Sequence, residues 1–352
     1  MVSCIIKEWE TLSQHYNIKS PVTIFFGGGT PSLLAVENVE LLISAISASG
    51  KALEVSLEAN PGDVLGKVES LRQAGVDRLS IGVQALDDDD LRALNRNHNR
   101  AEAVRAVEES LKIFPTATSA DLIFGRPGHS VRALKEELRV LADLGLPHLS
   151  LYQLTLERGT ALYREVRRGG LTLPGEEDMA EMYLSALHCL SSRGLRRYEV
   201  SNFSLPGSEC LHNQGYWSAR QYVGLGPGAH SRLGQAEGRL ALVNIPHPER
   251  WMCEVERAGH GVRQERNIAR RDSLKELLAT GLRTSAGVAG SDWERISGGT
   301  VRLGSLFDRA RPLDLGLVME QGAMRLAEEK ISVLDHVLPY VFNCLDDEIE
   351  IK

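Results

Sequence analysis

The sequence predicts an α/β fold built on a parallel sheet, and two observations carry this prediction. Between residue 22 and about residue 200, short apolar runs alternate with longer amphipathic stretches, which is the pattern of strands joined by crossover helices. The first apolar run ends directly in Gly27-Gly28-Gly29, and bare backbone at the carboxyl end of a parallel strand suits a polar ligand. Because such crossovers are right-handed and the units are many, we expect the sheet to curl into a full or partial barrel.

The expected strands are short and mostly apolar: Val22–Phe26, Leu53–Glu58, Arg78–Val83, Thr118–Ile123, His148–Leu154 and Tyr198–Ser201. The first is apolar throughout, which predicts burial on both faces. The expected helices lie between them, at Val36–Ser47, Val64–Ala74, Leu91–Leu94, Ala101–Phe114, Val131–Leu144 and Glu176–Arg193. The acidic run Asp87–Asp90 is interpreted as the first turn of a helix and not as a metal site.

The pattern changes after about residue 205, where Gly and Pro cluster in Leu205–Gly207 and Gly224–Gly228. Further on, we expect a helix at Asp272–Gly281, two short strands within Val318–Leu326 and a final helix at Val333–Phe342. This order is typical of a smaller, winged-helix-like α+β domain. The predicted division is therefore 1–205 for the barrel, 206–266 for an extension and 267–352 for the C-terminal domain.

The composition of the chain excludes several classes of protein. The chain has 352 residues, of which 43% are hydrophobic and 25% charged, as in ordinary globular proteins. Its net charge of −7 with dispersed acids argues against a general nucleic-acid surface. No apolar run approaches the roughly 18–20 residues that span a bilayer. The five cysteines are scattered without disulfide or metal-ligand spacing, which indicates a reducing compartment.

Small or polar residues stand at nearly every expected strand end. They are Gly27–Pro31, Glu58 with Asn60-Pro61, Gly82 with Gln84, Asp121 with Gly125, Gln153, and Asn202. For the glycines alone, a tight turn into a helix is an equal alternative. Taken together, the strand ends predict one shared ligand pocket at the carboxyl edge of the sheet.

Several strings resemble the radical S-adenosylmethionine (SAM) superfamily, and more narrowly the branch that contains the haem chaperone HemW and oxygen-independent coproporphyrinogen oxidase. In order, they are FFGGGTPS, LEANP, RLSIGVQ, DLIFGRPG, LSLYQLTLERGT, YEVSNF, HNQGYW and YVGLGPGAHS. The resemblance runs from Val22 to the C-terminus. It implies a partial (β/α)6 TIM-like barrel followed by the smaller domain.

The resemblance also implies a SAM site at the strand ends. It falls on Gly28, Gly29, Thr30, Glu58, Gln84, Arg96 and Asp121. The methionine part of SAM is a zwitterion with a cationic sulfonium, so carboxylates, an arginine and exposed peptide groups suit it. For Glu58 and Asp121, the alternative is helix capping or structural hydrogen bonding.

One family feature does not match. The family carries a CxxxCxxC loop whose thiolates hold a four-iron, four-sulfur cluster, and here only Cys4 precedes the glycine run. We interpret the chain as a truncated form that lacks the first barrel strand and the cluster loop, with loss of the cluster by divergence as the alternative. We then expect weak SAM binding at best, and no radical chemistry.

The string HNQGYW matches the HNxxYW pattern that is associated with haem in the HemW branch. It implies haem binding by His212, Asn213, Tyr216 and Trp217, with His212 as the iron ligand. His230 is a second candidate ligand and Cys210 a third. Without the resemblance, a histidine beside aromatic residues is more often a packed, hydrogen-bonded side chain.

Three functions remain open from the sequence. The first is a HemW-type haem chaperone that passes haem to acceptor proteins, with a homodimer as a possible state. The second is an oxygen-independent coproporphyrinogen III oxidase-like enzyme, and the third is a non-catalytic remnant. The resemblance points to mitochondria. The segment from Met1 to Asn17 has glutamates and no arginine, so it does not resemble a transit peptide.

Overall fold

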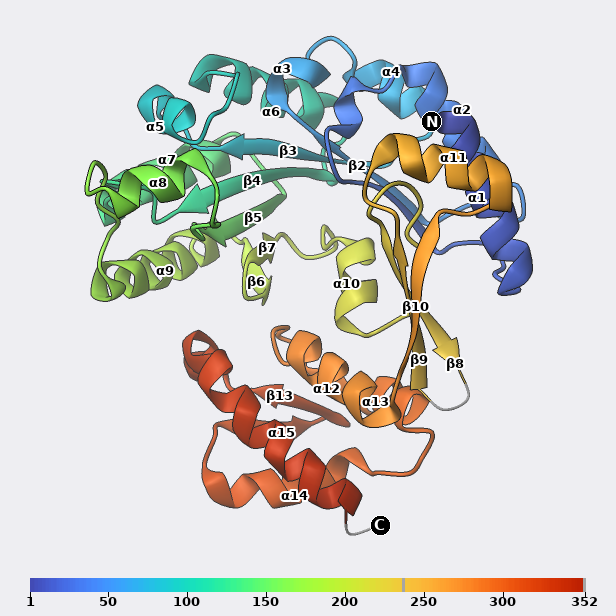
Figure 1. The fold of residues 1–352 in the computed structure, drawn as a ribbon. Helices are drawn as coiled ribbons and strands as arrows, with labels where there is room; N and C mark the ends of the chain where they lie inside the picture. Colours follow the sequence, from blue (N-terminus) through green and yellow to red (C-terminus); the bar gives the residue numbers. More distant parts are fainter. Residues whose placement is uncertain (236–237, 351–352) are drawn as a thin grey trace. The chain divides into compact units, whose positions relative to one another are not determined.

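The computed structural model describes residues 1–235 and 238–350 (Figure 1). The chain forms two compact units. The barrel unit comprises Val22–Ile43 and Ala52–Cys210, and the second unit comprises Met1–Pro21, Ser44–Lys51 and Leu211–Lys352.

The barrel unit is built on a curled seven-stranded sheet of order β1-β2-β3-β4-β5-β7-β6. Its strands are β1 (Thr23–Phe26), β2 (Glu54–Ala59), β3 (Arg78–Gln84), β4 (Thr118–Phe124), β5 (His148–Gln153), β6 (Arg196–Glu199) and β7 (Asn202–Ser204). The first five pair in parallel, as predicted. The expected sixth strand at Tyr198–Ser201 is right only for its first two residues, which end β6. Val200 and Ser201 form the turn between β6 and β7, which pair antiparallel with each other.

Helices join the parallel strands and confirm the crossover pattern. They are η1 (Pro31–Leu33), α2 (Val36–Ile46), α3 (Pro61–Val64), α4 (Val68–Gln73), α5 (Asp88–Ala93), α6 (Arg100–Ile113), α7 (Val131–Asp143), α8 (Ala161–Arg167) and α9 (Glu176–Ser191). The expected single helix Val64–Ala74 is wrong, since Gly66 at φ 75° separates α3 from α4. The acidic run forms a helix start, as predicted: Asp87 accepts hydrogen bonds from the backbone N–H groups of Asp89 and Asp90.

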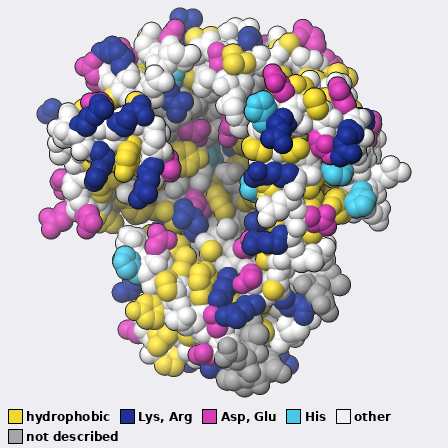
Figure 2. Space-filling view, viewed as in Figure 1, with side chains coloured by type: hydrophobic (Ala, Val, Ile, Leu, Met, Phe, Trp, Pro, Cys, Tyr) yellow, Lys and Arg dark blue, Asp and Glu magenta, His cyan; other side chains and the backbone are white. Residues whose placement is uncertain are grey.

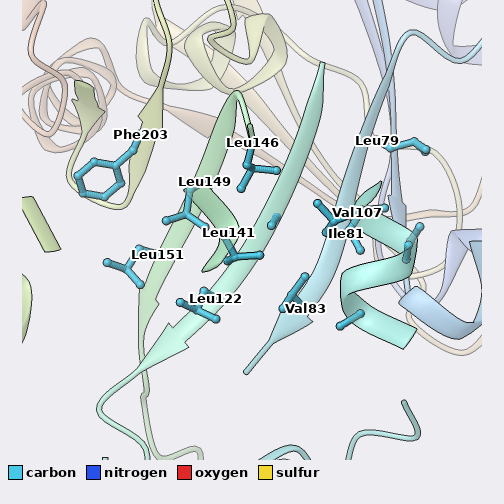
Figure 3. Close-up of a cluster of buried hydrophobic side chains, with 14 of the residues drawn as sticks. Leu79, Ile81, Val83, Val107, Leu122, Leu141, Leu146, Leu149, Leu151 and Phe203 are labelled. Carbon is cyan, nitrogen blue, oxygen red and sulfur yellow. The ribbon is translucent and has the colours of Figure 1, made fainter. Parts of the chain in front are cut away.

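Strand periodicity separates the two faces of this sheet. Large aliphatic residues of β3, β4 and β5 pack against α6 and α7, as Leu79, Leu122 and Leu149 do in Figure 3. The alternate positions carry Ser80, Asp121 and Ser150 on the opposite face. The expectation that Val22–Phe26 is buried on both faces is wrong: only Ile24 is buried in β1, because this strand is the first in the sheet order.

Charge is mostly interspersed on the surface. In the view of Figure 2, dark blue Lys and Arg side chains gather over α8. Arg164, Arg167 and Arg168 are exposed there, and α8 contributes no buried residue. Among the described residues, no helix is long and apolar enough to cross a membrane.

The second unit contains two antiparallel sheets and the remaining helices. The first sheet is β8 (His230–Gln235), β9 (Gly238–Asn244) and β10 (Val262–Ile268), ordered β10-β9-β8, with α1 (Val2–His15), α10 (Leu211–Trp217) and α11 (Pro248–Ala258) in the same unit. The predicted winged-helix-like part follows in the order α12 (Arg270–Gly281), β11 (Val288–Ala289), α13 (Gly290–Ser297), α14 (Leu303–Ala310), η2 (Arg311–Leu313), β12 (Leu317–Glu320), β13 (Ala323–Leu326), η3 (Glu328–Val333) and α15 (Leu334–Glu350).

A buried carboxylate fastens α1 to this unit. Glu8 has no exposed surface. Its Oε1 accepts hydrogen bonds from Asn244 Nδ2 at 3.1 Å, Trp251 Nε1 at 3.1 Å and the Gly261 backbone N–H at 2.8 Å. Its Oε2 accepts from the Gly226 N–H at 2.8 Å. Burial raises the pKa of Glu8, and these donors oppose that shift. One side chain therefore holds α11, β9 and two loops together.

We expect Glu8→Ala to lower the free energy of unfolding by about 3 kcal/mol or more, because it leaves four buried donors without their acceptor and opens a cavity. Urea unfolding followed by circular dichroism measures the change. Glu10→Ala, on the exposed face of the same helix, is the matched control and should shift stability by less than about 0.5 kcal/mol. Equal effects of the two variants would contradict the assignment.

Candidate functional site

The glycine run lies at the carboxyl end of β1 and contacts the end of β2. Gly28 and Gly29 adopt φ values of 75° and 64°, where residues other than glycine are strained. A Cβ at either position would meet nothing within 4 Å. Glycine is therefore required by the backbone conformation and not by a lack of space for a side chain. The Gly28 N–H donates to the Glu58 carboxylate. Burial raises the pKa of Glu58, and this hydrogen bond opposes the shift.

Asp121 is the second carboxylate at this edge of the sheet. The Ser80 hydroxyl lies 3.1 Å and 3.2 Å from its two carboxylate oxygens. The Ser150 hydroxyl, which donates to Asn202 Oδ1 at 3.3 Å, is a second polar neighbour that lowers the pKa of Asp121. Burial raises the pKa of Asp121 to about 6, and the negative charge of Glu58 adds to the rise. The pKa of Tyr152 is raised mainly by burial, and the negative charges of Asp121 and Glu58 add to this rise. Glu58 and Asp121 are therefore close enough to interact electrostatically.

Gln84 ends β3 with a φ of 66°, which is unusual for a residue with a side chain. The strand pairs Gln84 with Leu122, next to Asp121. Arg126 holds this conformation, because its Nη1 donates to the carbonyls of Gln84 at 3.1 Å and Ile123 at 2.9 Å. Arg126 is buried and forms an ion pair with Glu137 at 2.8 Å. The sequence analysis did not name Arg126 as a site residue, although it follows a glycine at a strand end and is the arginine of the DLIFGRPG string.

The structure thus gathers Gly28, Glu58, Gln84 and Asp121 at one edge. Gly29 and Thr30 follow Gly28 directly, and Thr30 is the N-cap residue of η1. Arg96 lies in the loop after α5 with an exposed side chain, close to His98. Among the described contacts, no hydrogen bond or ion pair joins the Arg96 side chain to the other predicted residues.

The HNxxYW string forms α10 in the second unit. His212 and Tyr216 stand four residues apart on one face of the helix, with ring centroids 4.9 Å apart. Tyr222 extends this cluster at 4.5 Å from Tyr216. Tyr216 is 40% exposed, and burial of the rest raises its pKa to about 12. Tyr222 was missed from the sequence because it lies outside the string.

Side chains distant in sequence hold the end of α10. Thr280 donates to the carbonyl of Trp217 at 3.1 Å. Arg295 donates to the next two carbonyls, those of Ser218 and Ala219. Arg239 donates to the carbonyl of Arg220 at 3.1 Å. Four consecutive carbonyls at the helix C-terminus thereby have partners from α12, α13 and β9.

The other predicted haem residues differ in exposure. Asn213 and Trp217 of α10 are both partly buried. His230 begins β8 with an exposed ring, which is accessible to a ligand. Cys210 is 4% exposed in the barrel unit, with its Sγ 3.5 Å from Glu54 Oε1. The thiol therefore points to a carboxylate and not to a solvent-accessible metal.

An iron–sulfur cluster does not fit the side chains that the structure describes. Three cysteines must lie close together to hold it, and Cys4, Cys189, Cys210, Cys253 and Cys344 are dispersed over both units. Across residues 1–235 and 238–347, no three His, Cys, Asp or Glu side chains form a group that could hold a metal ion. We assign no step to such a cluster.

The raised pKa of Asp121 predicts a pH dependence of stability. An aspartate in the unfolded chain has a pKa of about 3.9, and the folded value is about 6. Between these values the folded state holds a proton that the unfolded state has released, so stability falls as pH rises through this window. We expect Asp121→Asn to stabilise the protein by about 1–2 kcal/mol at pH 7.5 and to have little effect near pH 4.

Urea unfolding at pH values from 4 to 7.5 checks this prediction. Asp89→Asn removes an exposed carboxylate from the same unit and serves as the control. Parallel pH profiles for the wild type and Asp121→Asn would contradict it.

Comparisons with known proteins agree with this geometry. Residues 8–141 match the model of the radical SAM superfamily. The chain is 37% identical over 348 residues to radical S-adenosyl methionine domain-containing protein 1, mitochondrial, of Bos taurus, covering 95% of this chain and 78% of the relative. It is 35% identical over 272 residues to heme chaperone HemW of Bacillus subtilis, covering 76% and 71%.

Among solved structures, coproporphyrinogen III oxidase (HemN) of Escherichia coli superposes with a TM-score of 0.77 at 18% identity. The match covers 98% of this chain and 82% of that one. This likeness shows the fold, a curled radical SAM sheet followed by a C-terminal domain. The sequence relatives show the branch: the chain belongs to the radical SAM superfamily, as a HemW-type member of the group that contains radical S-adenosyl methionine domain-containing protein 1.

Proposed function

We propose that this protein is a haem-binding chaperone of the HemW type that also binds SAM at the strand ends of its barrel unit. The observation that carries the proposal is α10, where His212 and Tyr216 of the HNxxYW string share one helix face with a partly exposed aromatic cluster. The relatives named as heme chaperones support it. The likeness to HemN supports the fold alone, so a coproporphyrinogen oxidase activity is the weaker alternative.

The strand ends offer the groups that SAM requires. The bare backbone at Gly28, Gly29 and Thr30 would receive the methionine moiety. The Glu58 carboxylate would attract its ammonium group, and Gln84 and Asp121 would bind the ribose hydroxyls. Arg96 would have to move its exposed side chain to reach the ligand. SAM supplies a cationic sulfonium and an adenosyl group, and these residues would bind and orient both.

The haem site would use the face of α10. The imidazole of His212 would supply a nitrogen to the iron, and the rings of Tyr216 and Trp217 would pack on the porphyrin. Asn213 could orient the imidazole or bind a propionate. His230 is the second candidate for the iron. In this proposal the partners are haem-accepting proteins. The protein is mitochondrial in the same proposal, because its vertebrate relatives are named as mitochondrial proteins. A homodimer belongs to the same proposal.

Isothermal titration with SAM tests the barrel site. We expect weak binding, because the strand-end groups must act without an iron that chelates the amino acid. Glu58→Gln should weaken this binding at least fivefold, since it removes the charge that faces the ammonium group. Glu40→Gln, at an exposed position of α2, should leave it unchanged. Tight binding, or an affinity that is insensitive to Glu58, would contradict the proposed site.

Addition of hemin to the purified protein tests the haem site. We expect a shifted Soret band, and His212→Ala should both weaken binding and change the band position, because an iron ligand is lost. His188→Ala on α9, which lies outside the string, is the control. An unchanged hemin spectrum with the wild-type protein would reject haem binding by this chain.

A further inference from the structure

The β8 strand presents a second set of side chains beside the aromatic cluster. Tyr222 and Arg232 exchange both backbone hydrogen bonds, at 2.8 Å and 3.0 Å, so they lie directly opposite each other. Residues opposed in this way have their side chains on the same face. Strand periodicity adds His230, two residues before Arg232, to that face. Leu233, which follows Arg232, packs on the other face, with Leu240 and Leu242.

This face carries an excess of positive charge. Arg232 forms an ion pair with Glu276 of α12 at 3.2 Å. Arg239 of β9 shares the same carboxylate at 3.3 Å and is 5% exposed. Two positively charged guanidinium groups thus share one negatively charged carboxylate. Arg239 also holds the end of α10, so its donors are engaged, whereas the Arg232 side chain keeps 20% of its surface exposed.

The positive charge lies next to the aromatic rings. Arg232, Arg239 and their shared partner Glu276 all act electrostatically on the phenol of Tyr222, the two arginines in the opposite direction to the carboxylate. The ring centroid of Tyr222 is 4.5 Å from that of Tyr216. An apolar aromatic surface bordered by a partly exposed arginine suits a flat ligand with a carboxylate at its edge. Neutral aromatic ligands would leave the excess charge without a partner.

We infer that Arg232 is a binding residue for a carboxylate of a planar, dianionic tetrapyrrole, whose ring packs on Tyr216 and Tyr222. The inference rests on the proposed haem binding. It adds that Arg232 selects a tetrapyrrole with ionised carboxylates over one whose carboxylates are esterified. The guanidinium edge of Arg232 that faces away from Glu276 carries Nη1, which donates one N–H to the Ser231 carbonyl at 3.2 Å. In this inference the second N–H of that nitrogen donates to the ligand carboxylate. Arg239 stays on Glu276 and on the α10 carbonyl, where it fixes the position of both.

Titrations with hemin and with hemin dimethyl ester, in one buffer, test this inference, because the ester keeps the iron and the ring and loses both negative charges. The wild-type protein should bind hemin about tenfold more tightly than the ester, as expected for a hydrogen-bonded ion pair. Arg232→Gln should lose that preference by weakening hemin alone, and Arg232→Lys should retain part of it. Arg263→Gln, on exposed β10, should change neither affinity.

Glu276→Gln separates a binding role from a structural one. It removes the carboxylate that competes for Arg232, so it should raise the ratio of the hemin affinity to the ester affinity. A merely structural ion pair, which acts on α10 through Arg239, predicts that both affinities fall together and that the ratio stays unchanged. Equal binding of hemin and ester by the wild type, or equal weakening of both by Arg232→Gln, would overturn the inference while leaving haem binding intact. Failure of the wild type to bind either ligand would instead reject the proposed function and this inference with it.

Discussion

The parallel pairing of β1 to β5 is the constraint on which the barrel site depends. Parallel strands end at the same edge, so residues in or directly after four different strands come near one another although helices separate them in sequence. Strand periodicity then decides which of them face the ligand side. Leu79 and Leu122 pack under the helices, and the neighbouring Ser80 and Asp121 lie on the opposite face. A shift of one residue in any register would exchange these two sets.

That arrangement has an energetic cost, which the surroundings partly offset. Glu58 and Asp121 are like charges in a partly desolvated place, and burial raises the pKa of each. The Gly28 N–H and the Ser80 hydroxyl stabilise the charged forms. In the second unit Glu8 differs, because four N–H donors surround it and its carboxylate serves as an anchor. Hydrogen bonding therefore distinguishes Glu8, whose carboxylate has four donors, from the two carboxylates that we propose as ligand-binding groups.

The sequence predicted the parts of the fold that local patterns determine. Five parallel strands and their helices were readable because apolar runs alternate with amphipathic ones. The β6–β7 turn was not predicted, since the sequence of a short strand does not indicate whether it pairs parallel or antiparallel with its neighbours. The β8–β10 sheet was missed because β10 is Val262–Ile268, a run of mainly polar and exposed residues. Gly28, Glu58, Gln84 and Asp121 were named from strand ends and resemblance. Tyr222 and Arg126 lie in two of the quoted strings, but their roles depend on tertiary contacts that those strings do not reveal.

The haem string illustrates why a motif alone does not make a site. The helix α10 has 7 residues, too few to be stable in isolation. Its last carbonyl and the three that follow it accept hydrogen bonds from Thr280, Arg295 and Arg239, which come from three other elements. These contacts fix where α10 ends, and the helix geometry then places His212 and Tyr216 on one face. A chain with an intact HNxxYW string and neutral, short residues at 239 and 295 would therefore keep the motif and lose the orientation of its histidine.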